Sequence, residues 1–444
     1  MSKSSKIEKV AVLGAGVSGL SAAWFMKRCG IQAQVFEARN QVGGLARSFD
    51  WHGVTCDIAP HRLFTNDQEI LKALVSLVPM EMHLRKSKIY MSNRVIRDPI
   101  NPIELVLKLP VKTGIGLVWS FLFRPHLPED SFESMALNNF GRGLYKFFFQ
   151  PYTYKLFGVS PREISAAWGK QKLRSSGLFD AIKRNSKTFF KGFYYPGKGG
   201  YQAISDALYD DIEESVILNA EVIGLDQVGH KIVAVRYRIG DQMHEYECDR
   251  VISTIPLTVL GSMLGYEVGL RFKPIKIVYL HIDRPQVIPY HWIYFGDGDV
   301  VINRMAEFKN FSHNHHGGGS TVLCAEVTVQ TENPLDDVLQ ALKKYNLVDR
   351  SEVLDSLIVP IECGYPIYLK GYESLRAKAL DFFGAYQNLH LVGRNAEFRH
   401  IDIDEDFASA FKLVNRLYGQ VERVALETEQ AQEGQKWPLA VQSN

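Results

Sequence analysis

Cysteine is scarce in this sequence and is never closely spaced. The 444 residues include only five cysteines, and no two of them form a Cys-x-x-Cys pair. Zinc sites and redox dithiols need such pairs, so the spacing argues against both, and we expect a reducing compartment. His313, His315 and His316 lie close together but precede a glycine run without a fourth ligand, so we expect no bound metal.

The sequence also lacks an excess of charge. Lys and Arg total 51 against 49 for Asp and Glu, and this net charge of +2 lacks the strong positive charge typical of a nucleic-acid-binding protein. The first residues, MSKSSKIEKV, contain no apolar stretch of the kind found in a signal peptide. We therefore expect a cytoplasmic protein whose partner is a small-molecule substrate.

A long uninterrupted apolar run is missing too. The most apolar region, residues 103–123, is broken by two lysines, a glutamate and a proline: Lys108, Lys112, Glu104 and Pro110. It falls short of the roughly 20 clean apolar residues of a transmembrane helix. We expect it to form buried helices or to line an apolar channel, with membrane contact through 103–123 as the alternative.

What the chain does contain is typical of a large globular protein. The hydrophobic set makes up 46% of the residues and charged residues 23%, which fits two or three domains with a large core. Such a core needs no metal or disulfide for stability. Any bound cofactor would therefore take part in a reaction and would not be needed for stability.

The first 45 residues predict a strand, a glycine turn, a helix and a second strand. The apolar run Val10 to Leu13 is typical of a buried parallel strand, and a helix from about Val17 to Cys29 follows. Between them stand three glycines in the order Gly-x-Gly-x-x-Gly: Gly14, Gly16 and Gly19. In such a motif the glycines permit a tight turn, close approach of a pyrophosphate and close helix packing. The next strand ends at Glu37, an acid placed to accept a ribose hydroxyl, so we expect a dinucleotide site.

The rest of the chain is predicted to alternate between two kinds of structure. Residues 215–254 are typical of a meander of half-buried strands, and Asn388 to Val392 of a buried strand followed by an amphipathic helix from about Asp404. Two aromatic-rich parts, 86–194 and 266–354, are inserted between these pieces. Residues 426–444 lose periodicity and are expected to form a disordered tail.

The run after Glu37 resembles the second pyrophosphate-contacting segment of FAD enzymes of the glutathione-reductase and amine-oxidase type. The residues that carry this resemblance are Arg39, Gly43, Gly44 and Arg47. The two arginines suit the two phosphate charges of a flavin dinucleotide. Further along, the strand around Val222 resembles the one whose backbone reaches the adenine. Gly393, Arg394 and Asp402, before the last helix, resemble the segment that presents a helix N-terminus to the flavin.

Together these blocks resemble the FAD-containing superfamily of amine oxidases, protoporphyrinogen oxidases, phytoene-type desaturases and UDP-galactopyranose mutases. The resemblance implies an α/β fold in which a Rossmann-like FAD-binding domain of the glutathione-reductase type is interleaved with a mixed α+β substrate-binding domain. It assigns 1–85, 195–265 and 355–425 to the FAD-binding domain, and 86–194 and 266–354 to the substrate-binding domain. It also implies non-covalent FAD.

Several blocks resemble the mutase branch in particular. They are APHRLFTN at residues 59–66, Tyr152 to Lys155, YPGKGGY at 195–201, NRMAEFKNF at 303–311 and Tyr365 to Ile367. The resemblance makes His61, Arg304 and Tyr365 the candidate catalytic residues, with Arg304 facing a substrate diphosphate. Two positions depart from the mutase pattern, because Phe64 replaces a histidine and Phe157 a tryptophan.

Two reactions follow from the resemblance. In the first, a hydride passes from a bulky or anionic small molecule to flavin N5, which suits the aromatic insert. In the second, a UDP-galactopyranose mutase-like enzyme rearranges a nucleotide sugar without net redox change. The sequence leaves open whether substrate or Glu307 offsets the charge of Arg304, and it offers only Arg174 and Lys155 as further cations.

Overall fold

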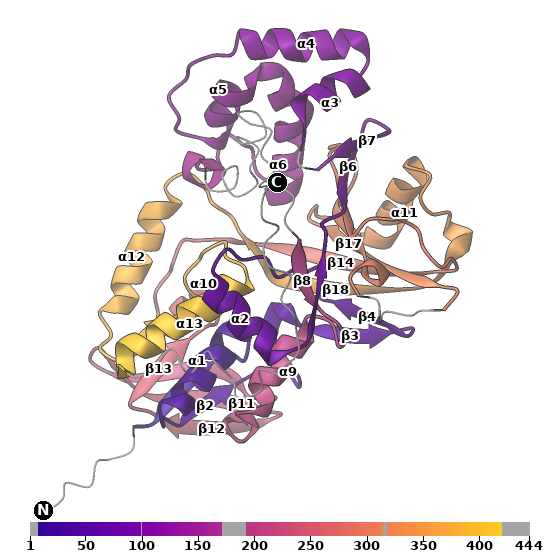
Figure 1. The fold of residues 1–444 in the computed structure, drawn as a ribbon. Helices are drawn as coiled ribbons and strands as arrows, with labels where there is room; N and C mark the ends of the chain where they lie inside the picture. The colour runs from indigo at the N-terminus through magenta and orange to yellow at the C-terminus, as the bar shows by residue number, and fades with distance from the viewer. Residues whose placement is uncertain (1–7, 99, 171–191, 313, 315–317, 420–444) are drawn as a thin grey trace, which may run out of the picture.

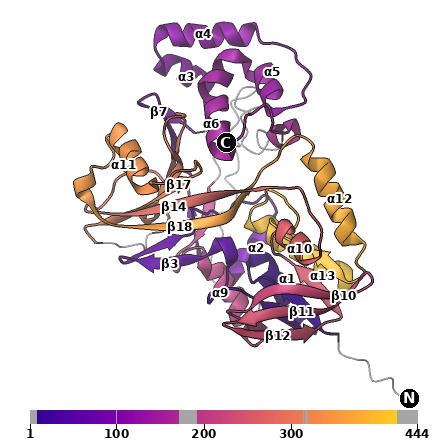
Figure 2. The ribbon, with the colours of Figure 1, turned by 180° about the vertical axis from the view of Figure 1, so that it is seen from behind.

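The computed structural model describes residues 8–98, 100–170, 192–312, 314 and 318–419 of the chain. Figure 1 shows three parts along the molecule: a lower part built on a parallel sheet, a long, mostly antiparallel sheet across the middle, and a helical part at the top. The parts are interleaved in sequence, as expected, because the chain passes between them several times (Figures 1 and 2). The fold is thus α/β with a parallel Rossmann-like sheet and a mixed second sheet.

The lower part contains a five-stranded parallel sheet in the order β19-β13-β1-β2-β9. Its strands are β1 (Val10–Leu13), β2 (Ala33–Phe36), β9 (Val216–Ile217), β13 (Arg250–Ser253) and β19 (Leu389–Leu391). All four residues of β1 are buried, because β2 and β13 flank the strand and helices cover the sheet. This confirms the predicted strand, turn, helix and strand at the start of the chain.

The region predicted as one meander divides between two sheets. Its middle forms a three-stranded antiparallel sheet of β10 (Glu221–Val228), β11 (Lys231–Ile239) and β12 (Gln242–Glu247). Its two ends, β9 and β13, instead join the parallel sheet. The alternating pattern was therefore read correctly as strands, but pattern alone does not say which sheet a strand joins.

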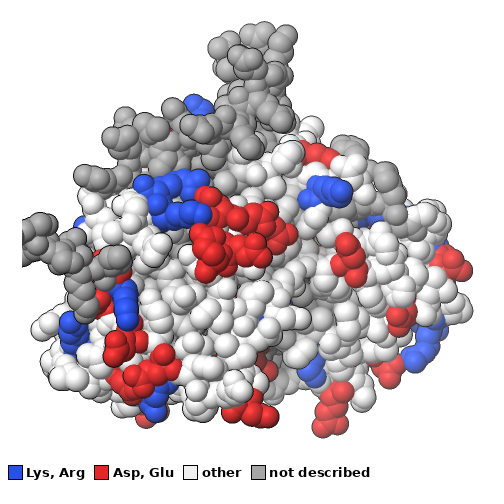
Figure 3. Space-filling model, turned by 90° about the horizontal axis from the view of Figure 1, so that it is seen from below, with Lys and Arg blue, Asp and Glu red and all other residues white. Residues whose placement is uncertain are grey.

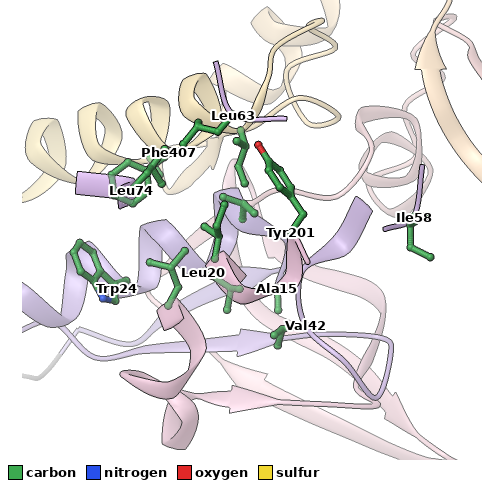
Figure 4. Packing of buried hydrophobic residues seen from close by; sticks show 14 of the residues in the cluster. Ala15, Leu20, Trp24, Val42, Ile58, Leu63, Leu74, Tyr201 and Phe407 are labelled. Carbon is green, nitrogen blue, oxygen red and sulfur yellow. The ribbon is translucent and has the colours of Figure 1, made fainter. Parts of the chain in front are cut away.

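Four helices pack around the parallel sheet and form its core. They are α1 (Val17–Arg28), α2 (Gln68–Leu77), α9 (Gln202–Asp210) and α13 (Ile403–Tyr418). Leu20 and Trp24 of α1, Leu74 of α2 and Phe407 of α13 are buried in one cluster (Figure 4). The helix predicted from about Val17 to Cys29 spans Val17–Arg28, with Cys29 as its C-cap, and Gly30 follows with a φ of 72°.

The middle part is a seven-stranded sheet in the order β18-β14-β17-β16-β15-β6-β7. Its strands are β6 (Ser87–Met91), β7 (Arg94–Arg97), β14 (Phe272–Ile282), β15 (Trp292–Phe295), β16 (Ile302–Glu307), β17 (Thr321–Val327) and β18 (Val353–Pro366). β18 pairs with β14 along most of its length. The boundary expected at residue 355 therefore falls inside a strand of this sheet instead of between two elements.

Two small hairpin-like sheets and three more helices complete these layers. β3 (Ser48–Trp51) pairs with β4 (Val54–Asp57), and β5 (Met80–His83) pairs with β8 (Phe193–Pro196). The helices are α10 (Leu257–Met263), α11 (Pro334–Lys344) and α12 (Tyr372–Gly384). The pairing of β8 with β5 therefore places the end of the first insert, residues 86–194, beside the segment that precedes this insert.

The upper part is built from α3 (Pro102–Lys108), α4 (Val111–Leu122), α5 (Phe132–Leu144) and α6 (Gln150–Phe157). A π-helical turn, Tyr145–Phe149, joins α5 to α6. Among the described residues no helix is long and apolar enough to cross a membrane. The expectation that region 103–123 is buried is wrong, however, because most large apolar side chains of α4 face solvent. The apolar pattern was real, but its outward direction is set by the packing of α4 on α5.

The predicted tail, 426–444, lies outside the described residues. So do Arg174 and the three histidines of the glycine-rich turn, His313, His315 and His316. Within the described part of the chain, no group of three or more His, Cys, Asp or Glu side chains is placed to hold a metal ion.

Candidate functional site

The first glycine turn is shaped by two close contacts and one open position. Gly14 has a φ of 95°, and a Cβ on Gly19 would lie 2.0 Å from the carbonyl oxygen of Gly14. Both residues must therefore be glycine for the turn and α1 to fit. Gly16 differs, because a Cβ there would meet only the Cα of Gly44, at 3.8 Å. The space above Gly16 is left for an occupant, and α1 begins there without a capping side chain or an acid in its first turn.

The second glycine pair lies directly against this turn. The Gly43 amide donates to the Ala15 carbonyl at 2.8 Å, and the Gly44 backbone approaches the Gly16 Cα within van der Waals range. Gly43 and Gly44 both have positive φ. The structure therefore joins two segments that the sequence singled out separately.

Glu37 has a structural task besides the one expected of it. One carboxylate oxygen accepts from the Ala15 amide at 2.9 Å and the other from the Arg39 amide at 3.0 Å. Each oxygen has further lone pairs, so a ribose hydroxyl remains a possible donor. The strand that contains Val222 starts beside it, because the Ala220 amide donates to the Glu37 carbonyl.

Two arginines supply positive charge near these glycines. The Arg47 guanidinium donates to the Gly44 carbonyl at 2.8 Å. Burial and the neighbouring Arg39 guanidinium lower the pKa of Arg47. Two cations that repel each other beside an open helix N-terminus are typical of a site for phosphates, which fits the pyrophosphate of a flavin dinucleotide.

The last helix approaches this site through Gly393 and Arg394. A Cβ on Gly393 would lie 2.4 Å from the Ser18 hydroxyl of α1. The Arg394 amide donates to Asp406 at 2.9 Å, and burial raises the pKa of that carboxyl to about 7. Asp402 precedes α13, whose first turn holds three acids of its own. These carboxylates offset the positive helix end expected here, whereas the Arg394 side chain contributes a positive charge.

His61 lies against the aromatic ring of Tyr201. The two rings stack 5.1 Å apart at an interplanar angle of 10°. Burial and the charges of Arg304 and Arg394 lower the pKa of His61 to about 4, so its imidazole is neutral at pH 7. Its Nδ1 is buried, and like the Arg394 Nε and the Tyr201 hydroxyl it has no hydrogen-bond partner among the described residues. These unpaired polar atoms fit a polar occupant.

Beneath His61, a buried aspartate fixes the position of Tyr201. Asp57 is fully buried at the end of β4 and accepts from the Tyr201 amide at 3.0 Å and the Tyr195 hydroxyl at 2.9 Å. Burial raises the pKa of Asp57 to about 6, although its hydrogen bonds oppose the shift. Asp57 is thus a positioning residue for the His61 side of the site.

Across from His61, a buried ion pair lies on the seven-stranded sheet. Glu326 of β17 accepts from the Nε and Nη2 of Arg304, at 3.2 and 2.9 Å, and from the Tyr365 hydroxyl at 2.6 Å. Arg304 and Glu326 are partners in the β16–β17 register, so their side chains leave the sheet on the same face. Burial favours a protonated Glu326, but the Arg304 charge and the hydrogen bonds hold its pKa below the usual value.

Within the protein, the partner of Arg304 is Glu326 and not Glu307. Glu307 is buried elsewhere, where it accepts from the Val287 and Ile288 amides and the Thr321 hydroxyl. The expectation that Glu307 pairs with Arg304 is wrong, because consecutive strand positions alternate in direction and Glu307 lies an odd number of residues from Arg304. Sequence reasoning missed Glu326, although one acid within the apolar strand TVLCAEV was a signal.

Two further expectations about the substrate side are corrected. The Lys155 ammonium is buried and donates to the Phe295 and Asp297 carbonyls, so it is not available to a substrate anion. Burial lowers its pKa to about 7. Phe157, at the position of the mutase tryptophan, is buried in the core against Trp168, with ring centroids 4.9 Å apart.

Most of the aromatic insert is core as well. Its buried members are Phe140, Tyr145, Phe148, Phe149 and Phe157. Phe147 and Tyr152 are only partly buried, and the neighbours that raise the pKa of Tyr152, after burial itself, include Tyr294, Glu326 and Tyr365. The side chains near Tyr152 are therefore polar: the Tyr365 hydroxyl, the Glu326 carboxylate and the Arg304 guanidinium.

Comparisons with known proteins agree on one family. The family described as "Flavin containing amine oxidoreductase" matches residues 17–349. The chain is 24% identical over 427 residues to the "Probable UDP-galactopyranose mutase" of Klebsiella pneumoniae, covering 93% of this chain and 96% of that protein. It is 26% identical over 306 residues to mitochondrial protoporphyrinogen oxidase of Nicotiana tabacum, covering 59% of this chain and 60% of that protein.

The fold has a close match among solved structures. A crystal structure of reduced UDP-galactopyranose mutase superposes with a TM-score of 0.81 at 21% identity, covering 94% of this chain and 97% of that one. At that identity the match establishes the fold. Its extent includes both sheets, whereas the tobacco oxidase match spans less than two thirds of either protein.

Proposed function

This chain belongs to the flavin containing amine oxidoreductase family, and on that premise we propose that it binds FAD non-covalently and rearranges a nucleotide sugar without net redox change. The mutase similarity supports this proposal because it extends over nearly the whole of both proteins. The oxidase match covers only about three fifths of each protein, so it supports a shared substrate less than the mutase match does.

The polar character of the substrate side is the observation that carries the proposal. Arg304, Glu326 and Tyr365 form one hydrogen-bonded group, and Tyr152 and Tyr294 lie near it. A sugar can pair with these donors and acceptors. A polyene or porphyrinogen core would gain no hydrogen bonds from this face, whereas sugar hydroxyls can bond to the donors and acceptors that the group leaves over. The site therefore favours a hydroxyl-rich substrate.

The described residues fit a bound FAD. The open position at Gly16, the N-terminus of α1 and the arginines Arg39 and Arg47 suit its pyrophosphate, and Glu37 suits its ribose. When bound, the flavin would supply the electron-rich centre that reacts with the sugar carbon. The protein supplies orientation and electrostatics.

The residues around the ring position have distinct tasks in this proposal. Arg394 is a cation for anionic groups of the ligand, since among the described residues its guanidinium forms only long hydrogen bonds, to the Gly364 and Ile401 carbonyls at 3.5 and 3.4 Å. Neutral His61, with its unpaired Nδ1, can hold or accept a proton. Burial and Glu326 raise the pKa of Tyr365, so its phenol remains a hydrogen-bond donor at neutral pH.

Anaerobic turnover tests the proposal directly. Purified protein is reduced with dithionite, incubated with UDP-galactopyranose and examined by chromatography for the furanose form, with the oxidised protein as the matched control. We expect the furanose form only with reduced protein. Absence of product from reduced protein with a full complement of FAD would contradict the proposal.

A hydride-transferring oxidoreductase is the second candidate, and one observation favours it. Glu326 already offsets the charge of Arg304, and carbonyl oxygens occupy Lys155, so the described residues offer a diphosphate fewer cations than the resemblance implies. A screen of flavin reduction against amines, porphyrinogens, polyenes and sugar nucleotides tests this candidate. Bleaching of the oxidised flavin by one substrate class would establish it.

A further inference from the structure

The outer face of α4 and the end of α3 expose a continuous set of large apolar side chains. This α4 face consists of Leu107, Val111, Ile115, Val118, Trp119, Leu122 and Phe123, whose exposed fractions are 78, 76, 63, 46, 63, 64 and 65%. Within α4 the spacing from Val111 is i, i+4, i+7, i+8 and i+11, which places these residues on one stripe. Such a stripe normally faces the core, but here it faces solvent.

Close packing fixes this orientation. The inner face of α4 carries small residues: a Cβ on Gly114 would lie 3.0 Å from the Val106 carbonyl oxygen. A Cβ on Gly141 of α5 would lie 2.2 Å from the Ser120 carbonyl oxygen, and one on Gly143 would lie 3.1 Å from Leu117 and Ser120. Turning α4 to bury its large residues would drive them into these contacts. The exposed face is therefore built into the fold.

Cations outnumber acids along this face. From Leu105 to Pro128 the sequence contains Lys108, Lys112 and Arg124 and no Asp or Glu, although Lys108 pairs with Glu104 of α3 at 2.6 Å. The opposite end of the molecule differs, because Figure 3 shows acidic and basic side chains next to each other there. Figures 1 and 2 show α4 lying across the extremity of the molecule, so that its outer face can meet a flat surface.

We propose that the α4 face docks onto the surface of an anionic lipid bilayer. α4 would lie in the plane of the interface with its apolar stripe among the acyl chains, and Lys112 and Arg124 would meet lipid phosphates. Trp119 and Phe123, whose rings are 4.5 Å apart, suit the depth between headgroups and chains. A second copy of the chain fits less well, because self-association would bring two sets of cations together without an acid from this stretch.

Vesicle flotation of the full chain with its cofactor tests the apolar part. We expect flotation with vesicles of phosphatidylcholine and phosphatidylglycerol in equal amounts, and little with phosphatidylcholine alone. Replacing Val111 and Trp119 together by Ser should weaken partitioning about tenfold or more, since both side chains lose apolar contact. The matched control replaces Val228 and Met243, which are 71 and 64% exposed on the β10–β12 sheet, and should float like the unmodified protein.

Charge variants test the electrostatic part. Lys112→Ala should weaken binding to the anionic vesicles about fivefold, whereas Lys343→Ala on α11 should not. Flavin content and the unfolding midpoint of each variant show that it is folded. The proposal is overturned if the protein does not float with anionic vesicles, or if the Val111/Trp119 variant floats as well as the control. It is also overturned if the protein is a dimer that this variant dissociates without any lipid present.

Discussion

Replacing Glu326 by Gln should destabilise the protein and impair its substrate side at once. The carboxylate accepts two hydrogen bonds from Arg304 and one each from Asn303 and Tyr365. Gln keeps the shape and one acceptor oxygen but removes the negative charge. The Arg304 guanidinium would then lie in the interior without its counter-ion.

The structure sets the size of this effect. Removing one partner of a buried ion pair costs about 3–5 kcal/mol. Glu326 is fully buried, but the Arg304 side chain is 21% exposed, which lets solvent screen part of its charge. We therefore expect a loss of about 3 kcal/mol in the free energy of unfolding, near the lower limit of that range.

Denaturant unfolding of three variants separates the pair from general damage. Glu326→Gln should lose stability, while the double variant Arg304→Met with Glu326→Leu should recover most of it, because no buried charge remains. Both should lose substrate affinity. Glu307→Gln is the control: it loosens the bonds to Val287 and Ile288 but leaves Arg304 paired, so affinity should be retained. A Glu326→Gln variant within about 1 kcal/mol of the unmodified protein, a typical surface-like effect, would refute the reasoning.

Three other predictions follow from the site. Gly16→Val should yield a folded but colourless protein, because the new side chain meets only Gly44 at the backbone and otherwise fills the space expected for pyrophosphate; absorbance at purification checks this, and a yellow variant with an unchanged flavin spectrum would contradict it. Arg394→Ala should lower the flavin reduction potential or weaken FAD binding with the fold intact, since it removes the cation beside Tyr365; potentiometry and FAD titration measure both, and no change in either would exclude this role. Asp406→Asn should gain stability relative to the unmodified protein as pH rises from about 4 to about 7, because the native carboxyl has a pKa raised to about 7 and keeps a proton that the unfolded chain releases near the ordinary pKa of Asp. Unfolding of the cofactor-free proteins at several pH values should show this divergence, and parallel curves would disprove it.

The dinucleotide half of the site was largely predictable from sequence. Gly14, Gly16, Gly19 and Glu37 belong to one local unit of strand, turn, helix and strand, in which chain connectivity alone brings the residues together. The approach of Gly43 and Gly44 to this unit was also anticipated, through resemblance. The sequence also predicted a helix N-terminus near Arg394. The helix is there, but the acids in the first turn of α13 offset its positive charge.

The substrate half depended on contacts between distant segments. Arg304 was recognised from its local motif, but its partner Glu326 lies on the next strand of the sheet, and register decides which acid it meets. Asp57 likewise acts on Tyr201, which is far away in sequence. No local pattern encodes such pairings.

The sequence by itself determined the class of fold, the family and the position of the glycine-rich turn, because periodicity and short motifs act over a few residues. Only the tertiary structure decided which polar groups share the substrate side and which apolar residues remain outside the core. The α4 stripe illustrates the reason. Its amphipathic pattern is the same whether it faces inward or outward, and the close approach of Ser120 to Gly141 settles the direction.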